Sequence, residues 1–255
     1  MSDWNSEQYM KFGAERNQPS ADLISRLREC EPKRILDLGC GPGNSTHNLA
    51  VRFPNAEITG VDFSEDMLAK ARQTYPELSF VQGCIPDDLE KLDGKFDLIF
   101  SNACIQWIPE HAVLIPAVFD KLADGGTLAV QTPYIQKALF YRLLNLLVNS
   151  GEWKKLSVIH NFHNLTPEEY YDLLGGLSKD FNIWETTYYH TVRSHSGVIE
   201  WYKGSGLRPY LDMLSDEERP QFLADLNEII SENFPTRENG SIILKMPRIF
   251  FTAKK

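Results

Sequence analysis

A glycine-rich segment between two apolar runs carries the residues with the clearest chemical meaning in this chain. The segment reads ILDLGCGPGN from Ile35, and its glycines are Gly39, Gly41 and Gly43. Glycine at a turn permits positive φ and lets a ligand approach the backbone closely. Asp62 follows Gly43 by nineteen residues and ends the next apolar run. An acid at this position is suited to hydrogen bonding with a ribose diol.

The spacing of the glycines distinguishes two kinds of nucleotide ligand. Dinucleotide-binding turns read G-x-G-x-x-G and place a pyrophosphate on a helix N-terminus. This turn reads G-x-G-x-G with Pro42 inside it, and Asp37 ends the strand pattern beside it. A carboxylate there would repel a pyrophosphate and attract an ammonium group, directly or through water. The chemistry therefore favours S-adenosylmethionine, which carries positive charge and no phosphate.

Strand and helix patterns alternate between residues 33 and 133. Such alternation predicts parallel strands joined by right-handed crossovers. After Pro133 helical patterns dominate, and strand patterns return at 182–192 and 242–252, where Pro247 marks a bulge or an edge. The first five strands are expected at 34–38, 57–61, 78–81, 96–101 and 127–132, and helices at 44–53, 64–74, 111–122, 134–149, 167–174, 196–203, 209–214 and 216–233.

These patterns predict an α/β fold with a doubly wound, mostly parallel seven-stranded sheet of the Rossmann-like kind. Helical insertions are expected to form a substrate cap over the carboxyl ends of the strands, where such sheets bind ligands. The predicted division is 1–30 as an N-terminal helical lid segment, 31–133 as the cofactor-binding core, and 134–255 as cap insertions with the last two strands.

Composition and charge exclude several classes of function. The formal net charge is −9, and the chain has no basic run of the kind that neutralises phosphates, so nucleic acid and anionic membranes are not expected partners. No leader peptide and no membrane-spanning segment is expected. The four cysteines form no C-x-x-C pair, which favours a reducing cytoplasm and no metal site. His160 and His163 lack further metal ligands at suitable spacing.

The segment from Asp37 to Gly43 resembles motif I of the class I S-adenosylmethionine-dependent methyltransferases. The resemblance covers residues 33–133, and it departs from the family at Cys84, where an acid near the adenine amino group is common. Backbone groups at Cys84 and Ile85 are expected to hold the ring instead. The cofactor-binding residues expected on this basis are Asp37, Gly39, Gly41, Gly43, Asn44, Asp62, Phe63, Cys84, Ile85 and Asn102.

A narrower resemblance, to the trans-aconitate methyltransferases, extends over nearly the whole chain. It implies esterification of one carboxylate of a small polycarboxylic acid, with trans-aconitate as the leading candidate. The segments that carry it are DWN from Asp3, GPGNST from Gly41, SNA from Ser101 with Gln106 and Trp107, TYYH from Thr187, GLRPY from Gly206 and PRIF from Pro247.

A carboxylate acceptor is ionised at neutral pH, so no catalytic base is required. The expected devices are cations that hold the other carboxylates and aromatic residues that exclude water. Gln106, Trp107 and His190 are expected to position the acceptor. The substrate-binding candidates are Tyr9, Arg16, Trp107, Tyr188, Arg208 and Arg248, for which surface ion pairs or core packing are the alternatives.

Alternation along the strand pattern places Tyr188 and His190 on one face and Tyr189 on the other. If the acceptor were a phenol or an amine on the same fold, His190 or His195 would be the candidate base. A nucleic-acid methyltransferase, an NAD-dependent oxidoreductase and a non-catalytic cofactor-binding regulator are the remaining alternatives. The glycine spacing and Asp37 disfavour NAD. The SNAC sequence after the fourth strand and the negative charge disfavour nucleic acid.

Overall fold

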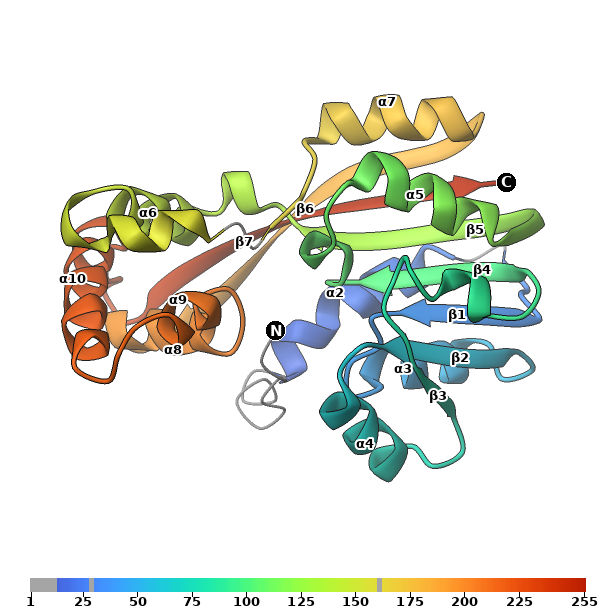
Figure 1. Ribbon diagram of the computed structural model, residues 1–255, viewed down its shortest axis with the longest axis horizontal. Helices are drawn as coiled ribbons and strands as arrows, with labels where there is room; N and C mark the ends of the chain where they lie inside the picture. Colours follow the sequence, from blue (N-terminus) through green and yellow to red (C-terminus); the bar gives the residue numbers. More distant parts are fainter. Residues whose placement is uncertain (1–12, 28–29, 160–161) are drawn as a thin grey trace.

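A single mixed sheet organises the chain. The computed structural model describes the backbone of residues 13–27, 30–159 and 162–255, and side chains from Asn17 onward. Within these residues the sheet has seven strands in the order β3-β2-β1-β4-β5-β7-β6 (Figure 1). The first five pair in parallel, and β7 pairs antiparallel with both β5 and β6. The bounds are β1 (Arg34–Leu38), β2 (Glu57–Asp62), β3 (Ser79–Gln82), β4 (Phe96–Asn102), β5 (Leu122–Pro133), β6 (Asp180–Val192) and β7 (Ile242–Lys254).

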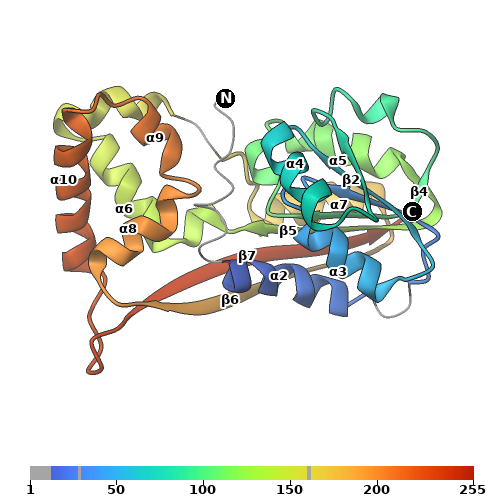
Figure 2. The same ribbon diagram turned by 90° about the horizontal axis from the view of Figure 1, so that it is seen from below.

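Helices cover both faces of the sheet, as continuous apolar strands require. On one face lie α2 (Gly13–Ser25) and α3 (Asn44–Arg52), and on the other α5 (His111–Asp120) and α7 (Pro167–Leu177) (Figure 2). Helix α4 (Glu65–Thr74) packs beside β2 and β3. The predicted doubly wound, mostly parallel seven-stranded sheet is thereby confirmed.

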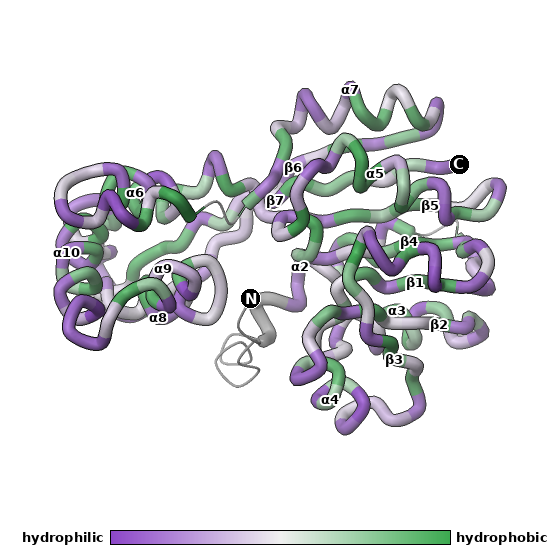
Figure 3. The backbone as a smooth tube through the Cα atoms, in the orientation of Figure 1, coloured by the Kyte–Doolittle hydropathy of each residue, from purple (hydrophilic) through white to green (hydrophobic). Residues whose placement is uncertain are grey.

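Side-chain alternation divides the core between the two faces. On β1, Ile35 packs toward α2 and α3 with Leu49, whereas Leu36 packs toward α5 with Ile115. Figure 3 shows the hydrophobic stretches along the central strands of the sheet. Burial on both faces fixes the register of these strands, because a shift of one residue would exchange the two sets of side chains.

A helical cap is carried on the long strands β6 and β7. These strands run past the carboxyl ends of β1 and β4, and the cap lies beyond those ends (Figure 1). It contains α6 (Leu139–Val148), α8 (His195–Lys203), α9 (Arg208–Asp212), α10 (Glu218–Asn233) and the 3₁₀ segment η4 (Gly151–Val158). Three short 3₁₀ turns lie elsewhere, η1 (Leu89–Lys91), η2 (Ile105–Trp107) and η3 (Ile135–Lys137).

Capping chemistry sets several helix boundaries. The Ser64 hydroxyl accepts a hydrogen bond from the backbone N–H of Met67, and Thr166 with Glu169 forms a reciprocal capping box. Ser215 and Glu218 form a second capping box, in which the backbone N–H of each donates to the side chain of the other.

Gly43, in the left-handed region, precedes α3, and that helix begins without a side-chain cap. Residues 134–149 are not one helix, because η3 comes before α6. Pro247 lies on an internal strand, next to Arg248, where the pairing of β7 with β5 ends, and its carbonyl oxygen accepts a 2.9 Å hydrogen bond from the Tyr134 backbone N–H. Its register with β6 is continuous, so it marks neither a bulge nor an edge of the sheet.

Candidate active site

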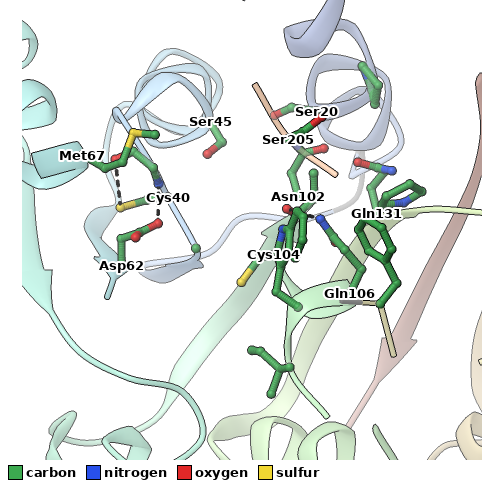
Figure 4. Close-up of a pocket in the computed structure, with 18 of the residues that line it drawn as sticks. Ser20, Cys40, Ser45, Asp62, Met67, Asn102, Cys104, Gln106, Gln131 and Ser205 are labelled. Atoms are coloured by element: carbon green, nitrogen blue, oxygen red, sulfur yellow. Dashed lines mark hydrogen bonds between the residues drawn. The ribbon is translucent and has the colours of Figure 1, made fainter. Parts of the chain in front are cut away.

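One cavity of about 510 Å³ opens between the carboxyl ends of the core strands and the cap. In Figure 4, Asp62 and Met67 lie at one end, and Asn102, Gln106 and Gln131 gather at the other. Of the positions expected from sequence, those that line the cavity are Gly39, Gly41, Asn44, Asp62, Phe63, Cys84, Ile85, Asn102, Gln106, Trp107 and Arg248.

The three glycines of the turn all have positive φ, +70°, +53° and +88° in chain order. A Cβ on Gly39 would lie 2.3 Å from the Cys104 side chain, and one on Gly43 would lie 2.9 Å from Phe80. These two glycines serve close packing within the chain. A Cβ on Gly41 would meet no atom within 4 Å and would project into open space. Gly41 is therefore the glycine that lets a ligand approach the backbone.

Asp62 braces this turn from the end of β2. Its Oδ2 accepts a hydrogen bond of 2.9 Å from the backbone N–H of Gly41, and its Oδ1 accepts one of 3.0 Å from Ser64. Each carboxylate oxygen has a second acceptor site. Asp62 lines the cavity. It can therefore hold the turn and accept from two vicinal hydroxyls at once, as a ribose diol requires.

Asp37 lies behind the cavity wall and is fully buried, which favours the second of the two contacts expected from sequence, through water and not direct. Its Oδ2 accepts hydrogen bonds of 2.7 Å from the hydroxyls of Ser45 and Thr46 in the first turn of α3. Its Oδ1 has no partner among the described residues. Ser45 lines the cavity, so its hydroxyl connects the buried Asp37 carboxylate with the cavity surface.

Burial raises the pKa of Asp37 from 3.8 to about 6, although the hydrogen bonds from Thr46 and Ser45 oppose the rise. A carboxyl whose pKa is raised on folding stabilises the fold below its unfolded pKa and loses that stabilisation as pH rises through the folded pKa. We expect the free energy of unfolding of Asp37→Asn, relative to wild type, to increase by up to about 3 kcal/mol from about pH 4 to about pH 7.

Urea titrations without ligand at several pH values measure this difference, with the exposed Asp66→Asn as control. Parallel stability profiles for wild type and Asp37→Asn would show that Asp37 is charged in the folded protein throughout this range.

The cavity wall beyond Asp62 is largely apolar. Phe63, Met67 and Ile85 line it together with Cys84, and Phe63, Cys84 and Ile85 were expected there from sequence. The backbone N–H of Cys84 donates a 2.7 Å hydrogen bond to Oδ2 of Asp88, which fixes the loop after β3. This wall suits a planar heterocycle held by packing and backbone groups.

The opposite end of the cavity combines aromatic rings with one cation. The Trp107 ring lies 4.7 Å from the Phe162 ring, centroid to centroid. Arg248 comes from β7 and lines the same space as Tyr202. Burial raises the pKa of Tyr202, and the positive charge of Arg248 opposes the rise, which places that charge close to the phenol. This end is suited to hold an anion away from water.

The side chain of Gln106 is buried and fully engaged. Its Nε2 donates a 2.6 Å hydrogen bond to the carbonyl oxygen of Ala103, and its Oε1 accepts one of 3.3 Å from the Thr132 hydroxyl. Gln106 therefore shapes the cavity by fixing the loop after β4.

Three expected substrate-positioning residues lie away from the cavity lining. Tyr188 is buried under α2 and donates a 2.6 Å hydrogen bond to Asp22, so it fastens that helix to β6. His190 stacks on Trp201 with centroids 5.0 Å apart. Arg208 lies 3.6 Å from Asp212 on the same short helix.

The alternation expected along β6 is nonetheless confirmed, since Tyr188 and His190 share a face and Tyr189 is 63% exposed on the other. Tyr9 and the side chain of Arg16 lie outside the described residues.

Several lining residues were not expected from sequence. They come from α2, α3 and α4, from β7 and the end of β5, from the segment before α7 and from the cap. The carboxyl end of a parallel strand was a usable signal for Gln131, but the contributions of the cap depend on long-range packing that leaves no local pattern. They include Ser20, Ser45, Met67, Gln131, Tyr141, Phe162, Tyr202 and Met246.

Two further classes of site receive no support within the described ranges. No group of three or more potential ligands from His, Cys, Asp and Glu gathers there as a metal site would require. No helix in that part of the chain has the length and apolar character needed to cross a bilayer.

A mostly parallel sheet with an antiparallel β7, a G-x-G-x-G turn at β1, an acid at the end of β2 and a cap over the strand ends fits a Rossmann-like methyltransferase. The family model described as "Methyltransferase domain" matches residues 31–188. The chain belongs to this methyltransferase family and, within it, to the group that contains the trans-aconitate 2-methyltransferases.

The similarity to that group extends over the full length. The trans-aconitate 2-methyltransferases of Methylobacterium nodulans and an Enterobacter species are 38% and 39% identical to this chain, covering 100% of it and 99% of each relative. Among solved structures, phosphoethanolamine N-methyltransferase 2 of Haemonchus contortus, in complex with S-adenosyl-L-methionine, has a TM-score of 0.57 at 16% identity. That alignment covers 93% of this chain and 52% of the other and shows the shared fold.

Proposed function

We propose that this methyltransferase esterifies one carboxylate of a small polycarboxylic acid, with trans-aconitate as the leading candidate. S-adenosylmethionine supplies an activated methyl group on a cationic sulfur. The observation that carries the proposal is that one cavity joins the open Gly41 turn and Asp62 to Arg248. The full-length similarity to trans-aconitate 2-methyltransferases supports the choice of acid.

The residues present suit this methyl donor. Asp62 offers acceptors for a ribose diol, and Gly41 leaves room beside the turn. The Asn102 side chain lines the cavity, and its Oδ1 is buried without a partner among the described residues, as an acceptor for an ammonium group would be. The apolar surface at Phe63 and Ile85 suits the purine.

The chain's role in the reaction is to bind, orient and exclude water. An ionised carboxylate attacks without losing a proton, so the reaction needs no base. Asp62 and Gly41 hold the donor, Arg248 orients the acid by charge, and Trp107 with Phe162 shields the reacting atoms.

The cysteines and the net charge indicate the cellular compartment and the kind of partner. All four cysteines are free in the structure, which supports a reducing cytoplasm. The net charge of −9 supports a small-molecule partner and disfavours nucleic acid and anionic membrane surfaces.

The experiment that tests this proposal is a panel of acceptors incubated with wild-type protein and methyl-labelled S-adenosylmethionine. The panel contains trans-aconitate, cis-aconitate, citrate, isocitrate, fumarate, a catechol and a primary amine. We expect label in an alkali-labile methyl ester, with trans-aconitate the best acceptor. Transfer to the phenol or the amine alone, or to no acid, would contradict the proposal.

A further inference from the structure

We propose that Gln131 is a specificity-determining residue that donates a hydrogen bond to a carboxylate of the acid other than the one methylated. Ser20 and Arg248 complete this subsite, called here the Gln131 subsite. The inference rests on the proposed function, because it takes a polycarboxylate as the ligand.

The first observation is the state of the Gln131 carboxamide. The residue is fully buried, yet neither Nε2 nor Oε1 has a hydrogen-bond partner among the described residues. Buried polar groups in proteins are nearly always paired, and one left unpaired destabilises the fold. Gln131 lines the cavity, so a bound molecule can supply the missing partner.

A second buried glutamine, Gln106, can be compared with Gln131. Gln106 lies in the same cavity wall, and both ends of its amide are engaged by Ala103 and Thr132. The chain therefore satisfies a buried amide where the role is to hold a loop. Gln131 differs because its amide is left available at the cavity.

The register of the sheet brings further groups beside Gln131. Gln131 pairs with Asn102 on β4, and Pro133, two residues on, pairs with Arg248 on β7. Residues two apart on a strand share a face, and paired residues on adjacent strands do too. Asn102, Gln131 and Arg248 thus lie on the face that α2 covers.

Helix α2 supplies the remaining group. Ser20 is 2% exposed, and its hydroxyl has no partner among the described residues. It lines the cavity, and Figure 4 shows it at the same end as Gln131 and Asn102. The bond from Tyr188 to Asp22 fixes α2 two residues further along.

The chemistry of these groups selects an anion. A carboxylate only accepts hydrogen bonds, and here it would meet an amide N–H₂, a hydroxyl and a guanidinium. Hydrogen bonds from an amide and a hydroxyl are directional and fix where the carboxylate lies, whereas attraction to a cation alone does not. An acid with a second carboxylate at the matching distance is therefore preferred over a monocarboxylate.

Two substitutions of Gln131 test the subsite, one by adding a negative charge and the other by removing the amide. Gln131→Glu keeps the size and places a negative charge against the bound carboxylate. Gln131→Met keeps the volume and removes the unpaired amide. The control is Gln73→Glu on α4, the same change at an exposed position outside the cavity.

We expect Gln131→Glu to raise KM for trans-aconitate by about 100-fold and Gln131→Met by about 10-fold, with kcat within about threefold of wild type. Affinity for S-adenosylhomocysteine stays unchanged in both. The apparent Tm of Gln131→Met without ligand rises, because an unpaired buried amide is gone. Unchanged KM with a lowered Tm would assign Gln131 to packing alone and overturn the proposal.

A binding measurement separates failure of the subsite from failure of the proposed function. The probe is trans-aconitate titrated into protein saturated with S-adenosylhomocysteine. Absence of product with wild type, while trans-aconitate still binds wild type and not Gln131→Glu, would refute the reaction and keep the subsite. Equal binding of trans-aconitate to wild type and Gln131→Glu, or no binding to either, would refute the subsite.

Discussion

Replacing Asp62 by alanine is expected to weaken binding of S-adenosylhomocysteine by about 100-fold or more, a loss of about 3 kcal/mol. The carboxylate accepts from the backbone N–H groups of Gly41 and Ser64 and is placed to accept from the ribose diol. Hydrogen bonds to charged groups contribute about 1.5–3 kcal/mol each, so loss of the diol alone accounts for the effect.

Titration calorimetry measures this affinity, and two further variants interpret it. Asp62→Asn keeps one acceptor oxygen and is expected to lie between alanine and wild type. Asp66→Ala removes an exposed acid from the first turn of α4 and is expected to bind as wild type does. A thermal melt of each variant without ligand separates loss of the site from loss of the fold. Wild-type affinity in Asp62→Ala would contradict the assigned role.

Replacing Arg248 by methionine is expected to have the second large effect, a rise of about 100-fold or more in KM for trans-aconitate. Methionine keeps the apolar stem and removes the charge. Affinity for S-adenosylhomocysteine is expected to change little. Arg248→Lys restores charge without the planar fork and is expected to recover only part of the loss.

Arg208→Met is the matched control, since Arg208 was an equal candidate from sequence but pairs with Asp212 away from the cavity lining. Steady-state kinetics with varied acid and saturating methyl donor measure both variants. A larger effect at Arg208 than at Arg248 would place the acid among the cap helices and not at the strand ends.

The cofactor end of the site was readable from sequence because it is built from contiguous segments. The strand–turn–helix pattern predicted the glycine turn from Gly39 to Gly43 and the acid at Asp62. The positive φ values of the glycines and the hydrogen bond from Gly41 to Asp62 agree with that prediction. Asp37 was placed correctly at the strand end. Its burial beneath Ser45 depends on where α3 begins, and no local sequence pattern indicates that burial.

The acid-binding end could be predicted only in part, because it is assembled from segments far apart in the chain. Resemblance to a family indicated Arg248. Alternation correctly placed Tyr188 and His190 on one face, but only packing decides that α2 covers Tyr188 there. Gln131 stands in an apolar strand and looks like an ordinary strand residue in the sequence. Its unpaired amide becomes visible only when every neighbour is placed.

The most direct test of the central claim compares S-adenosylhomocysteine and NAD as ligands of the wild-type protein by titration calorimetry. The G-x-G-x-G spacing and Asp37 favour a phosphate-free ligand, and the unpartnered Oδ1 of Asn102 suits an ammonium group. We therefore expect one S-adenosylhomocysteine per chain to bind and NAD neither to bind nor to compete. Binding of NAD that displaces S-adenosylhomocysteine, or no binding of S-adenosylhomocysteine at all, would contradict the account.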